Sequence, residues 1–68
     1  MENIKRALMA NGETAEQAEE SCRMILEDAE EIILSQGSYD DISDMLLSDY
    51  GLDADHEIEV LTALGPRF

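Results

Sequence analysis

The segment from residue 15 to residue 35 constrains the fold most, because its apolar residues recur with the period of an α-helix. At 3.6 residues per turn they fall within one arc, and most of the acidic residues of the segment fall on the opposite side. A helix with two such faces buries one and exposes the other. The segment therefore predicts a long amphipathic helix with a buried arc of Ala15, Ala18, Cys22, Ile25, Leu26, Ala29, Ile32 and Ile33.

Cap signals delimit this helix and predict three more. Thr14 and Gln17 have the spacing of a capping box, in which each side chain accepts a hydrogen bond from the backbone of the other residue. Gly37 is expected to end the long helix, and Gly51 the third. Ser38 and Asp53 are the expected N-caps of the third and fourth helices. The shorter helices are expected at residues 2–10, 39–49 and 54–64.

The two later helices are also expected to be amphipathic. The inward-facing residues predicted for the third helix are Tyr39, Ile42, Met45, Leu46 and Tyr50, and those for the fourth are Ile58, Leu61 and Leu64. No stretch predicts a strand, and the connections are short, which favours helices packed as hairpins. We therefore predict an all-α fold, a small four-helix bundle, with residues 1–68 as a single helical domain and 65–68 as a short C-terminal tail.

The charge is unevenly distributed. Between Arg23 and Arg67 the chain has twelve Asp and Glu residues and no Lys or Arg, and its formal net charge is −13. Such a field repels nucleic acid and anionic membranes and attracts basic proteins. We therefore expect neither direct nucleic-acid binding nor a membrane partner. The chain shows no signal-peptide pattern or membrane-spanning run and has a single cysteine, Cys22, which fits a cytoplasmic location.

No motif predicts catalysis, a cofactor or a metal site. The acidic cluster that begins at Asp49 fails the test for a calcium loop, because neither Asp49 nor Asp53 is followed by Gly at the sixth position and Glu at the twelfth. Zinc would need several His or Cys residues, and the chain has only His56 and Cys22. We expect a protein that is not an enzyme.

Four carboxylates lie close to one line along the long helix, and we call them the acidic column: Glu16, Glu20, Glu27 and Glu31. Neighbours four residues apart are separated by about 6 Å along the axis, which resembles the spacing of phosphates on a nucleic-acid strand. Met24 and Leu34 are expected on the same side, where apolar residues among carboxylates suit an interface. The column is expected to lack neutralising cations; its alternative interpretation is a solubilising surface.

Two short sequence segments are NGETAEQA at residues 11–18 and YGLDAD at residues 50–55. These segments resemble segments of small acidic all-helical proteins of phages and other mobile elements. Some of those proteins are anti-restriction or anti-CRISPR inhibitors that imitate nucleic acid. The resemblance implies an anti-defence inhibitor, but it transfers no functional residue to this chain.

Three functions follow as hypotheses. The first is a non-enzymatic inhibitor, a monomer or weak homo-oligomer, that docks on a basic nucleic-acid-binding protein through the acidic column, Met24 and Leu34. The second is a small structural or regulatory subunit that associates through its apolar surface, including Leu34, Leu47 and Phe68. The third is a carrier protein, which the serines disfavour because none lies in an Asp-Ser-Leu-like motif.

Overall fold

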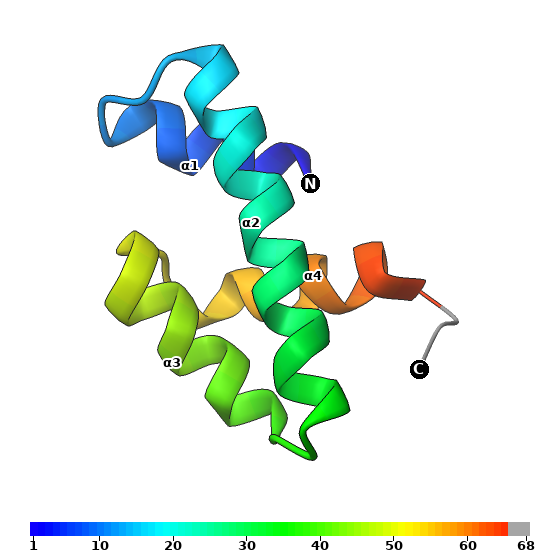
Figure 1. The fold of residues 1–68 in the computed structure, drawn as a ribbon. Helices are drawn as coiled ribbons and strands as arrows, with labels where there is room; N and C mark the ends of the chain where they lie inside the picture. Colours follow the sequence, from blue (N-terminus) through cyan, green and yellow to red (C-terminus); the bar gives the residue numbers. More distant parts are fainter. Residues whose placement is uncertain (66–68) are drawn as a thin grey trace.

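The computed structural model describes residues 1–65 and shows four α-helices (Figure 1). They are α1 (Glu2–Ala10), α2 (Ala15–Leu34), α3 (Tyr39–Tyr50) and α4 (Glu57–Leu64), with one 3₁₀ turn, η1 (Ala54–His56), before α4. No strand occurs within the described range. The prediction of a small all-α four-helix bundle is confirmed.

The long helix α2 organises the bundle. It contacts α1, α3 and α4, and Figure 1 shows α1 near its first turns, α3 near its last turns and α4 crossing it. The core draws on every α-helix and on the α3–η1 connection. Its buried side chains are Ile4, Leu8, Ala18, Ile25, Ala29, Ile42, Leu46, Leu52, Val60 and Leu64.

The arc predicted for α2 faces this core. Ala18, Ile25 and Ala29 are fully buried, and the other members are half-buried except Ala15, which is exposed in the first turn of the helix. The periodicity of α2 therefore placed its buried face correctly, and the opposite, acidic face is left to solvent.

The inward faces of α3 and α4 need correction. Tyr39 is 60% exposed and Ile58 is 73% exposed, whereas Val60 is completely buried. Tyr39 is the first residue of α3 and lines a depression together with Leu61 rather than entering the core. The chain enters α4 through the tighter turn of η1, and Glu59 is directed at α1. In the resulting orientation of α4, Val60 faces the core and Ile58 faces solvent.

The capping box at the start of α2 is confirmed. The Thr14 N–H donates to Gln17 Oε1 at 3.0 Å, and the Gln17 N–H donates to Thr14 Oγ1 at 3.2 Å. At the start of α3 the Ser38 N–H donates to Asp41 Oδ2 at 2.9 Å. Asp53 occupies the N-cap position of η1, but its side chain accepts no capping hydrogen bond.

The ends of α2 and α3 use different residues in the left-handed conformation. Gly51 takes this role after α3, with φ of 67°, and the next residue, Leu52, packs back into the core as expected. After α2 the left-handed residue is Gln36, with φ of 65°. Gly37 follows it and donates its N–H to the Ile32 carbonyl at 2.7 Å. The helix therefore ends one residue earlier than Gly37 predicted.

A carboxylate from α4 caps the first helix. Glu59 accepts the N–H of Ile4 at 2.8 Å and that of Asn3 at 3.3 Å. These two amides lie in the first turn of α1 and have no partner within that helix. Partial burial alone would raise the pKa of Glu59, but the two backbone hydrogen bonds and the N-terminal ammonium hold this pKa below its ordinary value.

We expect Glu59→Gln to lower the free energy of unfolding by about 1 kcal/mol near pH 7, the usual value of a helix cap. Because the folded pKa of Glu59 is depressed, its contribution is present above the unfolded pKa and is lost as pH falls through the folded pKa. Urea unfolding from pH 7 to pH 3 should therefore show the two proteins converging in acid. Asp55→Asn, an exposed carboxylate in the same segment, should leave stability nearly unchanged. A wild-type advantage that stayed constant as the pH fell would contradict this role for Glu59.

Candidate protein-interaction surface

The acidic column lies on the exposed face of α2. All four of its carboxylates are exposed, and α2 is a continuous helix of 20 residues. The two apolar residues predicted beside the column are exposed as well, Met24 at 44% and Leu34 at 67%. The structure therefore presents all six predicted binding residues on the solvent side of α2.

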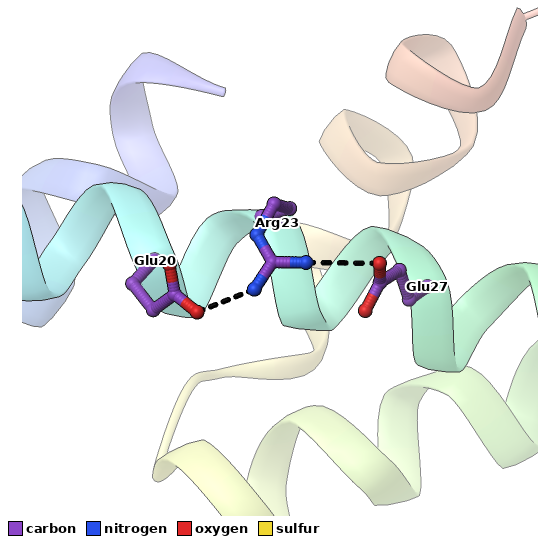
Figure 2. Close-up of polar contacts among 3 residues, drawn as sticks. All are labelled: Glu20, Arg23 and Glu27. Atoms are coloured by element: carbon purple, nitrogen blue, oxygen red, sulfur yellow. Dashed lines mark hydrogen bonds and ion pairs between the residues drawn. The ribbon is translucent and has the colours of Figure 1, made fainter.

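The column does contain a cation, which corrects the expectation that it has none. Arg23 lies between Glu20 and Glu27 and forms an ion pair with each of them, the pair with Glu27 at 3.0 Å (Figure 2). The hydrogen bond and the charge of Glu20, followed by the charge of Glu27, raise the pKa of Arg23. Arg23 thus neutralises part of the middle of the column.

The remaining negative charge is concentrated toward the other end of α2. The three Lys and Arg residues among residues 1–65 all lie within the first 23 positions. Lys5 pairs with Glu19 at 3.0 Å, and Arg6 pairs with Glu2 at 3.6 Å. The last turns of α2 and α3 contain no basic residue, although helix C-termini favour cations. The second half of α2 and all of α3 therefore form an acidic region without a cation of its own.

A shallow concavity lies in this region, along the last turns of α2. We call it the α2 concavity, and its lining residues are Glu27, Glu30, Glu31, Leu34 and Ser35. Glu31 forms no ion pair within residues 1–65. Leu34 supplies an apolar wall beside the carboxylates. This combination can receive a Lys or Arg side chain, whose methylene groups pack on apolar surface while its charged end meets a carboxylate.

A second concavity adjoins the first between α2 and α3. It shares Glu31 and Ser35 with the α2 concavity and adds Asp28, Met45 and Asp49, among others. Tyr50 donates its hydroxyl hydrogen to Asp28 Oδ2 at 3.3 Å. Burial, and then the charge of Asp28, raise the pKa of Tyr50 to about 12, so the phenol stays protonated and keeps this hydrogen bond. Glu31 stands where the two concavities meet.

The structure thus divides the six predicted binding residues into two groups. Glu27, Glu31 and Leu34 line the α2 concavity together, whereas Glu16, Glu20 and Met24 lie outside it. Sequence reasoning missed Arg23, Glu30 and Ser35. Arg23 had a signal, because it follows Glu20 by three residues and precedes Glu27 by four, which are the spacings of helical ion pairs.

Cys22 is half-buried on α2, and burial raises the pKa of its thiol, which disfavours the nucleophilic thiolate. Within residues 1–65 no three His, Cys, Asp or Glu side chains are placed to hold a metal ion.

Leu47, one of the residues through which the subunit hypothesis expects association, is 62% exposed. Phe68 lies outside the described residues.

Comparison of the chain with family models, with curated proteins and with solved structures yields no match. The resemblance to acidic proteins of phages therefore stays a prediction. Over the part of the chain that the structure describes, no helix combines the length and the apolar character needed to cross a bilayer.

Proposed function

We propose that this chain is a non-enzymatic, acidic protein-binding module that docks on a basic, nucleic-acid-binding protein and blocks it. The observation that carries the proposal is the α2 concavity, where Leu34 lies among carboxylates and no Lys or Arg of residues 1–65 is a lining residue. Glu27 and Glu31 are one helical turn apart, about 6 Å along the axis. In this role they imitate phosphates, and an inhibitor carried by a phage or mobile element would act in this way.

The ion pairs of Arg23 leave the half of the acidic column that contains Glu31 as the better place for a partner cation. Glu20 and Glu27 already pair with Arg23, so a partner cation gains most at Glu31 and at the side of Glu27 that faces the concavity. Leu34 adds apolar contact at the same place. Charge complementarity of this kind speeds association and selects partners, while apolar contact slows dissociation by removing Leu34 from water.

The test compares two variants that each remove two negative charges. Glu27→Gln/Glu31→Gln changes the α2 concavity, and Asp40→Asn/Asp44→Asn changes exposed carboxylates on α3. Basic proteins captured from a host lysate by the wild-type chain should be released by a short DNA duplex, because both compete for one groove. For a partner identified in this way, the first variant should weaken binding about tenfold, or 1.4 kcal/mol, and the second much less.

Two results would count against this function. One is a captured partner that DNA does not displace, since a phosphate mimic must occupy the nucleic-acid site. The other is equal affinity of the wild type and Glu27→Gln/Glu31→Gln at physiological ionic strength, where surface charges are already partly screened.

A further inference from the structure

A separate, mainly apolar depression lies between α4 and the start of α1. Met1 and Asn3 line it on the α1 side, and Ile58, Thr62 and Ala63 line it on the α4 side. Ile58 is 73% exposed, the most exposed large apolar residue among residues 1–65. A single exposed apolar residue is common on protein surfaces. Here it belongs to a concave surface with other apolar groups, which is typical of a binding site.

The two sides of the depression are connected by hydrogen bonds. Glu59 on α4 accepts the backbone N–H groups of Asn3 and Ile4 on α1 at 3.3 and 2.8 Å. These bonds fix the start of α1 relative to α4, while Ile4 and Val60 anchor the same two helices in the core. A ligand would therefore meet a shape that is already formed, which lowers the entropic cost of binding.

The charges around the depression favour a basic ligand over a second copy of the chain. Asp55 and Glu59 are among its lining residues, the N-terminal ammonium offsets part of the charge of Glu59, and no Lys or Arg among residues 1–65 lines the depression. A second copy of the chain would bring another net charge of −13 to the same surface, and the repulsion opposes such a dimer. A basic segment has the complementary charge, and one apolar side chain on it could cover Ile58.

We propose that this depression is a docking site for an apolar side chain presented by a basic segment of a partner protein. None of the residues lining the α2 concavity lines this depression. The site is therefore a second contact surface, and it does not depend on phosphate mimicry by α2. A protein with both sites engages its partner through charge on one surface and through an apolar anchor on the other.

Two synthetic peptides of equal length and equal positive charge serve as probes. One alternates Lys with Leu in an amphipathic pattern, and the other has Ser in place of every Leu. Ile58→Ser should weaken binding of the Leu peptide about tenfold, the effect of losing one well-buried apolar contact, and leave the Ser peptide unchanged. Ala63→Gln, which fills the depression from an exposed position, should have the same selective effect.

The variant Glu27→Gln/Glu31→Gln separates this proposal from the proposed function. It should weaken both peptides by the same factor, because Glu27 and Glu31 do not line this depression and act on a peptide bound there only through their charge. Amide chemical shifts of Ile58, Thr62 and Ala63 should move with the Leu peptide only. Equal binding of the Leu peptide to wild type, Ile58→Ser and Ala63→Gln would overturn the docking site, whatever the result at Glu27 and Glu31.

Discussion

Replacing Val60 by Asp is expected to unfold the domain, whereas the same substitution at Ile58 should leave it folded. Val60 is completely buried and Ile58 is 73% exposed. An unpaired carboxylate in an apolar core costs several kcal/mol. The net stability of a domain this small is roughly 5 kcal/mol, so Val60→Asp removes most or all of it. The measurement is far-ultraviolet circular dichroism during urea unfolding at pH 7.

The two variants control for each other. Both add one Asp near the start of α4, so they change the net charge and the interaction with the helix dipole in nearly the same way. They differ in the direction of the side chain. A folded Val60→Asp protein together with an unfolded Ile58→Asp protein would show that α4 has the opposite rotation, with Ile58 inward, as the spacing of Ile58, Leu61 and Leu64 alone predicts.

The contrast between α2 and α4 explains how much of the fold the sequence could predict. The 20 residues of α2 span several turns, so one apolar arc repeats often enough to define its buried face. The eight residues of α4 span about two turns, and its apolar residues cover a wide arc. The burial of Val60 rather than Ile58 accompanies the contact between Glu59 and α1, which joins positions 55 and 56 residues apart. Local periodicity contains no record of such a contact.

The candidate interaction surface was predictable to a similar degree. Helical spacing identified the column and the exposed Leu34 because both depend on a single helix. The ion pairs of Arg23 also follow from local spacing within one helix. They were missed because the charge count began after Arg23 and so did not consider Arg23 as a partner of Glu20 and Glu27. The second concavity, which joins Glu31 and Ser35 to Met45 and Asp49 of α3, depends on how two helices pack. That packing lies beyond any rule about spacing within one helix.

The turn after α2 provides the second large effect. Gly37→Ala is expected to lower the free energy of unfolding by about 2 to 3 kcal/mol, as overpacking does in a well-packed structure. A Cβ atom at residue 37 would lie 2.6 Å from Ile32 Cγ2 and 2.8 Å from the Ile32 carbonyl oxygen. The same carbonyl accepts the Gly37 N–H at 2.7 Å. Relief of the clash would therefore weaken the hydrogen bond that closes the turn.

The neighbouring residue gives the matched control, with the opposite sign. Gln36 is the only non-glycine residue with positive φ among the described residues, and a side chain in that conformation costs about 1 kcal/mol relative to Gly. Gln36→Gly should therefore raise the urea midpoint while Gly37→Ala lowers it, both with an unchanged m-value. If Gly37→Ala were neutral and Gln36→Gly destabilising, neither the close approach of residue 37 to Ile32 nor the strained conformation of residue 36 would hold, and the turn after α2 would have a different conformation.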